Sequence, residues 1–174
     1  LGFSFSRFFA KPIAALITAK GREALQRTVD LSQRELQLDV IYGDTDSVMI
    51  NSNSKDFKEV MQLGHQVKSK VNELYRDLEL DIDGVFSSML LLKKKKYAAV
   101  VVSERNGTFE YEKELKGLDL VRRDWCALSK DTGRWVVDKL LSGQPKEEIV
   151  MEIHDYMSEI AAKIKNNQRD LNEC

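Results

Sequence analysis

Two short runs of alternating apolar residues, separated by an acidic tetrapeptide, limit the fold of this chain more than any other feature. Apolar side chains stand at positions 38, 40 and 42 and again at 48 and 50, with Gly-Asp-Thr-Asp between the runs. Alternation with a period of two predicts β-strands, and glycine and aspartate favour turns. Residues 38–50 therefore predict a β-hairpin whose tip carries two carboxylates.

Helical periodicity lies on both sides of this hairpin. Pro12 opens a run of apolar residues at helical spacing, which predicts a helix over about residues 11–36. After the hairpin, apolar positions from Phe57 to Leu74 trace one face of a second helix. Ser54 is the expected N-cap of that helix, with Asp56 favourable in its first turn.

The second half of the chain returns to a period of two and then becomes helical. Strands are expected over residues 80–92, 97–102 and 108–115, with an Asn-Gly turn at 106–107. From about Val121 onward helices are expected, with Trp125 and Trp135 as packing residues in them and an apolar stripe after Pro145. The predicted fold is α+β: an antiparallel sheet with helices on one face, followed by a mainly helical segment. The expected boundary divides residues 1–119 from residues 120–174.

The composition is that of a globular protein, with 43% apolar and 32% charged residues in a chain of 174. No apolar run reaches the roughly 18 residues of a transmembrane helix. The first residues resemble no signal peptide, and the missing initiator methionine suggests a piece of a longer chain.

Cys126 and Cys174 form no C-x-x-C pair, so a zinc site or disulfide framework is not expected and a reducing compartment fits. The net charge of −1 makes any nucleic-acid binding depend on local patches.

The acidic tip of the hairpin is a candidate metal site. Asp44 and Asp46 are one residue apart, so their carboxylates repel each other unless a cation shares their oxygens. Mg²⁺ favours one or two protein carboxylates together with waters and substrate phosphates. Two other interpretations stay open: ordinary turn chemistry, in which aspartate caps local amides, and the D-x-D motif with which nucleotide-sugar transferases hold a metal.

A run of four lysines, residues 93–96, is the strongest basic feature. Consecutive lysines on a strand would place charge on both of its faces, and such a cluster can neutralise phosphates in a salt-dependent manner. The alternative is a solvated edge strand that its lysines protect from aggregation. The residues alone do not decide between the two.

Four segments together resemble family B DNA polymerases. Tyr-Gly-Asp-Thr-Asp-Ser at 42–47, set between two alternating strands, resembles motif C of that family. Ser-Arg-Phe at 6–8, with Lys-Gly-Arg-Glu at 20–23, is similar to the helix that follows the fingers. L-K-K-K-K-Y-A at 92–98 is similar to the basic motif of the palm, and K-G-L-D-L-V-R-R-D-W at 116–125 to the passage from palm to thumb. The lysine run and V-R-R-D-W-C are most similar to the eukaryotic member that extends the primers of a primase.

The resemblance implies a role for each matching residue. Asp46 is the implied main metal ligand and Asp44 the supporting one, both catalytic, while Tyr42, Gly43 and Thr45 shape the pocket near the primer terminus. The implied DNA-binding residues are Lys94, Lys95, Lys96, Tyr97, Lys116, Arg122 and Arg123.

The resemblance also implies an activity: two-metal phosphoryl transfer to a primer with two Mg²⁺ ions, in nuclear DNA replication. The implied partners are a primer–template DNA or RNA–DNA duplex, a deoxynucleoside triphosphate, and primase with an accessory subunit; no membrane is involved. Residues 1–119 would then belong to the palm and 120–174 to the start of the thumb.

Two further motifs of the family do not occur in the chain. These are the acidic strand D-x-x-S-L-Y-P, called motif A, and the nucleotide-gripping fingers helix. We therefore expect the isolated chain to be inactive, and to associate through the sheet edge that motif A would cover. A catalytically dead nucleic-acid-binding or scaffold fragment of the same fold is the alternative function.

Overall fold

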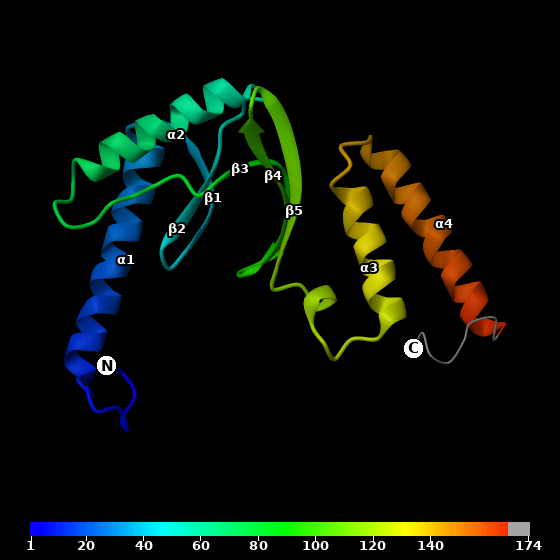
Figure 1. Ribbon diagram of the computed structural model, residues 1–174, viewed down its shortest axis with the longest axis horizontal. Helices are drawn as coiled ribbons and strands as arrows, with labels where there is room; N and C mark the ends of the chain where they lie inside the picture. Colours follow the sequence, from blue (N-terminus) through cyan, green and yellow to red (C-terminus); the bar gives the residue numbers. More distant parts are fainter. Residues whose placement is uncertain (167–174) are drawn as a thin grey trace. The chain divides into compact units, whose positions relative to one another are not determined.

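A computed structural model describes residues 1–166 of the chain (Figure 1). Antiparallel sheets and helices make it an α+β protein, as predicted. The chain divides into two compact units, Leu1–Asp83 and the residues from Gly84 onward. This division concerns compactness, so the boundary between palm and thumb near residue 119 stays a prediction. Within the described part, no helix has both the length and the apolar character needed to cross a membrane.

The first unit contains a long helix, the acidic hairpin and a second helix. Helix α1 spans Lys11–Arg34, strands β1 and β2 span Asp39–Asp44 and Ser47–Asn51, and helix α2 spans Phe57–Asn72. The hairpin and both helices are confirmed. Three side chains from α1 and α2 form the buried core, and partly buried residues from the loop before β1, from β2 and from the segment after α2 pack on it. The buried residues are Leu31, Val67 and Val71, with Leu36, Leu38, Ile50, Tyr75 and Leu80 against them.

The start of α2 differs from the expectation. Asp56, and not Ser54, is the N-cap, because its Oδ1 accepts a hydrogen bond of 2.7 Å from the backbone N–H of Lys58. Ser54 lies two residues before Asp56, where its hydroxyl accepts from the Asp56 backbone N–H and donates to the Glu59 carboxylate. Both residues therefore satisfy backbone groups at this helix end, but in shifted positions.

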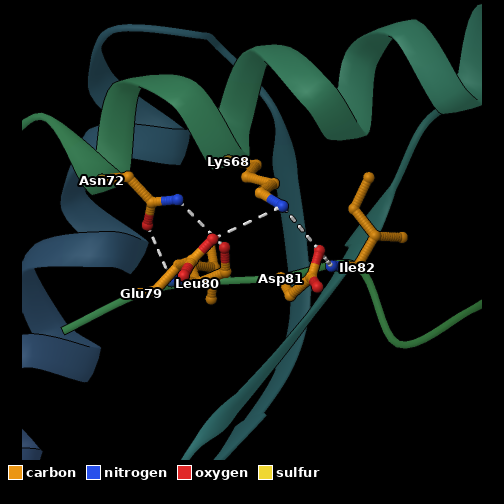
Figure 2. Close-up of polar contacts among 6 residues, drawn as sticks. All are labelled: Lys68, Asn72, Glu79, Leu80, Asp81 and Ile82. Atoms are coloured by element: carbon orange, nitrogen blue, oxygen red, sulfur yellow. Dashed lines mark hydrogen bonds and ion pairs between the residues drawn. The ribbon is translucent and has the colours of Figure 1, made fainter.

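The segment after α2 is extended without belonging to a sheet (Figure 2). The Asn72 side chain donates to the carbonyl of Leu80 at 3.1 Å and accepts from its N–H at 2.7 Å. Lys68 binds the Asp81 carboxylate at 2.9 Å, which together with the Ile82 N–H lowers the pKa of Asp81. The strand expected from residue 80 therefore begins only at Val85, because a helix side chain takes the backbone bonds of Leu80.

The second unit begins with a three-stranded antiparallel sheet in the order β3-β4-β5. Its strands span Val85–Lys93, Lys96–Arg105 and Thr108–Lys116. Asn106 and Gly107 form the turn between β4 and β5 with φ of 52° and 77°. Positive φ at both central residues is the geometry of a type I′ hairpin turn, which Asn-Gly favours, so this prediction is confirmed.

Helices follow the sheet, but later than expected. A 3-10 turn, η1, spans Asp119–Val121, and helices α3 and α4 span Ala127–Leu140 and Lys146–Lys165. The residues between η1 and α3 are not helical, and Trp125 among them is 41% exposed, so its expected packing role is wrong. Trp135 does pack, since its ring stacks on Tyr156 of α4 with centroids 3.9 Å apart.

The core of the second unit lies between the sheet and α3. Ala98 on β4 is fully buried against Leu118, Val137 and Leu141. Leu120 of η1 lies directly over Gly133 of α3, where an added Cβ would collide with its side chain. These contacts attach the segment that follows β5 to the first helix after it.

Candidate functional site

The acidic tip of the hairpin is a two-residue turn, formed by Thr45 and Asp46. Asp44 ends β1, Ser47 begins β2, and the two are register partners. The backbone N–H of Asp46 donates to the carbonyl of Asp44, so the bond spans only Thr45, which has φ of 52°. A γ-turn of this kind, with a β-branched residue at positive φ, is a strained conformation.

Short side-chain bonds hold the same turn. Thr45 Oγ1 donates to Asp44 Oδ1 at 3.2 Å, and Ser47 Oγ donates to the Asp44 carbonyl at 3.3 Å. Asp44 is half-buried and Asp46 is exposed. The backbone thus fixes two carboxylates on either side of one residue, while the Asp46 side chain stays accessible.

This donor set fits a magnesium ion that also binds groups from outside the chain. Within residues 1–166, no cluster of three or more histidine, cysteine, aspartate or glutamate side chains could enclose a metal ion. Asp44 and Asp46 supply two carboxylates, and Mg²⁺ commonly takes that many and completes its shell with water and phosphate oxygens. The chemistry of the pair is therefore compatible with a metal that a substrate helps to bind.

The three residues predicted to shape the pocket all lie beside the two carboxylates. Tyr42 is half-buried on β1 opposite Met49, Gly43 lies opposite Val48, and Thr45 is at the tip. A Cβ added at Gly43 would make only an ordinary contact, 3.7 Å from the Ser47 carbonyl oxygen. The packing of the chain itself therefore does not require glycine at this position.

The lysine run lies at one end of the three-stranded sheet, in a different arrangement from the expected one. Lys93 ends β3 and Lys96 begins β4 as register partners, and Lys94 and Lys95 form the turn between them. Lys95 has φ of 62°. The four lysines are thus not consecutive residues of one strand, because two of them make a hairpin turn.

Tyr97 and Lys116 lie side by side next to this turn. They are register partners on β4 and β5, two positions from the pair Ala99 and Glu114, so all four side chains share one face of the sheet. Glu114 Oε1 accepts from the Tyr97 hydroxyl at 3.1 Å and lies 3.1 Å from the Lys116 ammonium. Sequence reasoning did not identify Glu114, because its role depends on the register.

Lys96 lies on the opposite face, with Ala98 and the buried core. Its ammonium is 3.0 Å from Asp119 Oδ1, in η1. Asp119 was likewise not identified from the sequence, since nothing local marks it as the partner of a lysine in β4.

Gly117 connects the lysine turn to the segment after β5. It has φ of 61°, and an added Cβ would collide with the backbone carbonyl of Lys95. Glycine is the residue that tolerates both conditions. The sequence signal was available, because a glycine directly after a strand often marks a close backbone approach.

The two arginines lie after η1 in an exposed, non-helical stretch. Arg122 makes two hydrogen bonds to the Asp124 carboxylate, at 3.0 and 2.8 Å, and these lower the pKa of Asp124. Arg123 follows in the same exposed stretch. The structure therefore brings Lys94, Lys95, Lys96, Tyr97 and Lys116 together at one end of the sheet, with the arginines a few residues further along the chain.

The protein family of the chain follows from the comparison with known proteins, together with the acidic hairpin and the basic end of the sheet. The family model of DNA polymerase family B matches residues 1–174, and the chain belongs to that family. Among its relatives are the DNA polymerase alpha catalytic subunits of Mus musculus, 57% identical over 95% of this chain, and of Xenopus laevis, 53% identical over 95%. That of Drosophila melanogaster is 52% identical over 94%. The expected similarity to this subunit is confirmed, and the chain spans 11% of the length of each of these relatives.

Proposed function

We propose that this chain is the part of a DNA-directed DNA polymerase that carries motif C, the end of the palm and the root of the thumb. The observation that carries the proposal is the acidic hairpin tip, where Asp44 and Asp46 flank the strained Thr45 in a chain of DNA polymerase family B. Strain held between two carboxylates has no evident benefit for folding. It is understandable where a fixed spacing of charged oxygens serves a function.

Asp46 and Asp44 would hold Mg²⁺, with Asp46 as the main ligand because it is the exposed one. The intact enzyme would use two such ions, which supply charge stabilisation for in-line transfer of a nucleotidyl group. The residues of the chain itself fix the carboxylates and, through Tyr42, Gly43 and Thr45, border the position of the primer end.

The basic end of the three-stranded sheet would bind the primer–template duplex. Lys94 and Lys95 lie in the turn, and Tyr97 and Lys116 lie beside it on one face. Arg122 and Arg123 would add contacts with the duplex in the segment that leads to the thumb. Such contacts with backbone phosphates are independent of sequence and weaken steeply with salt.

The proposed substrates are a primer–template duplex and a deoxynucleoside triphosphate. The resemblance to the eukaryotic family member that extends primers extends the proposal to primase and an accessory subunit as partners and to the nucleus as the location. The isolated 174-residue chain would not polymerise, because it carries neither motif A nor the fingers helix.

Metal-directed cleavage tests the proposal at the hairpin. In the full-length polymerase, iron(II) in place of magnesium, with ascorbate and peroxide, generates radicals that cut the nearby backbone. We expect cuts close to residues 44–46 that Asp46→Asn abolishes. Asp39→Asn is the matched control, since Asp39 is an exposed aspartate at the other end of the same hairpin and should leave the cuts unchanged. Cuts that persist in Asp46→Asn would contradict the proposal.

A further inference from the structure

Lys96 forms an ion pair with Asp119 on the face of the sheet opposite to Tyr97 and Lys116. We propose that Lys96 is a positioning residue for duplex binding. Through Asp119 it fixes the segment that leads to Arg122 and Arg123, and it makes no phosphate contact of its own. The inference rests on the proposed binding of the duplex at the basic end of the sheet. It changes the role of Lys96, which was expected to be one of the DNA-binding residues.

The faces of the sheet give the first argument. Side chains alternate along β4, and Lys96 shares its face with Ala98, which is fully buried in the core against α3. Tyr97 and Lys116 are on the other face. Ala99 of that face is itself fully buried, so a duplex would reach Tyr97 and Lys116 at the end of the sheet, on the side opposite to the Lys96 side chain.

The position of Asp119 gives the second argument. Its carboxylate holds Lys96, while its backbone carbonyl accepts from the N–H of Arg122 at 3.0 Å. A single residue thus links the first residue of β4 to the first of the two arginines. Two neighbouring contacts hold the same segment, Gly117 against the Lys95 carbonyl and Leu120 over Gly133.

The degree of exposure sets the expected size of the effect. The side chains of Lys96 and Asp119 are 29% and 39% exposed, so the pair is neither buried nor fully solvated. Pairs of this kind contribute modestly. Loss of the pair should therefore weaken duplex binding about two- to fivefold, through a less ordered arginine segment.

A second ion pair on the same face provides a matched control. Lys113 of β5 binds Asp138 of α3 at 2.6 Å, and Lys113 shares the helix-facing side of the sheet with Lys96. This pair also connects the sheet to the helical part, but it does not involve the segment before Arg122. Lys113→Gln should leave duplex binding unchanged.

The test measures primer–template affinity of the full-length polymerase as a function of salt. Each phosphate contact contributes about 0.9 to the slope of log K against log salt concentration. The variants are Lys96→Gln, Asp119→Asn, the double variant, Lys96→Arg, Lys116→Gln, Arg122→Gln and the control Lys113→Gln. We expect Lys116→Gln to lower the slope by about 0.9. Lys96→Gln, Asp119→Asn and the double variant should weaken binding equally with the wild-type slope, and Lys96→Arg should restore affinity by keeping the pair.

Three results would overturn the inference. They are a fall of about 0.9 in the slope for Lys96→Gln, tighter binding for Asp119→Asn, and unchanged affinity for both variants. The first would make Lys96 a phosphate ligand, and the second would make Asp119 a competitor of the phosphate. Failure of the proposed duplex binding at the basic end of the sheet is distinguishable, because then Lys116→Gln and Arg122→Gln would also leave both affinity and slope unchanged.

Discussion

The backbone N–H of Asp46 donates a hydrogen bond to the carbonyl of Asp44, which closes a γ-turn around Thr45 at the hairpin tip. The backbone positions of the two aspartates are therefore set by this turn, and the Thr45 hydroxyl contacts the Asp44 carboxylate in addition. Thr45 occupies positive φ to make this possible. The candidate metal site and the local strain are consequences of the same turn.

The first prediction is that a substitution that relieves the backbone strain at Thr45 stabilises the hairpin. Asparagine adopts positive φ more readily than the β-branched threonine, so Thr45→Asn should stabilise the hairpin by about 1 kcal/mol. Amide hydrogen exchange of peptides from residues 39–51 in the full-length enzyme should slow accordingly. Thr108→Asn, at an exposed strand position without positive φ, should give no such protection. Faster exchange in Thr45→Asn would show that the turn is unstrained.

Substitution of two glycines that have positive φ separates the cost of backbone strain from the cost of a steric collision. Gly107→Ala meets only the cost of its φ of 77°, about 1 kcal/mol, because nothing lies near its added Cβ. Gly117→Ala adds a collision with the Lys95 carbonyl and should cost about 1–3 kcal/mol more. It should also displace the lysine turn and weaken duplex binding. If both variants had equal effects on amide hydrogen exchange and on duplex binding, the close approach of Gly117 to the Lys95 carbonyl would be contradicted.

The bonds between Asn72 and Leu80 predict a local change in stability. Asn72→Ala removes two partly buried hydrogen bonds and should destabilise the extended segment by about 2 kcal/mol. The measurement is hydrogen exchange of peptides from residues 77–84. Lys70→Ala, two residues earlier on α2 with an exposed partner at 3.7 Å, should change the free energy of local opening by about 0.5 kcal/mol or less. Similar effects of both substitutions would show that Asn72 does not hold the segment.

Cys126 predicts a pH-dependent reactivity. The thiol donates to the Ser129 hydroxyl at 3.2 Å and accepts from the Ser129 backbone N–H at 3.4 Å. Both contacts lower the pKa of the thiol, because the hydroxyl can reverse its bond and donate, as the N–H does, to the thiolate. Since the thiolate is the reactive form, Cys126 should alkylate faster near pH 7 than an ordinary thiol of pKa about 8.5. Ser129→Ala should shift the rate profile to higher pH, as followed by peptide mass spectrometry. An unshifted profile would refute the assigned cause.

Periodicity was sufficient where structure is local. The hairpin at 39–51, both helices of the first unit and the Asn-Gly turn follow from spacing and turn chemistry alone. The lysine turn was missed because Lys95 takes a positive φ that glycine or asparagine normally signals. The partners Lys96 and Asp119 are 23 residues apart, and such pairings depend on register that no local pattern encodes.

The carboxylates Asp44 and Asp46 could be selected from the sequence because repulsion between neighbouring aspartates is visible there. Their fixed spacing could not be predicted, since it depends on the conformation of Thr45. Glu114 and Asp119 could not be selected either, because acidic residues at the surface are common. Glu114 obtains its partners from the register of β4 and β5, and Asp119 obtains Lys96 from the path of the chain after β5.

Primer extension by the full-length polymerase, with wild type compared to Asp46→Asn at fixed magnesium, tests the central claim most directly. Binding of the primer–template is measured in parallel, and Asp39→Asn serves as the control. The proposed role of Asp46 as a metal ligand predicts that Asp46→Asn abolishes extension while duplex binding is retained. Unimpaired extension by Asp46→Asn would show that the acidic hairpin is not the active site.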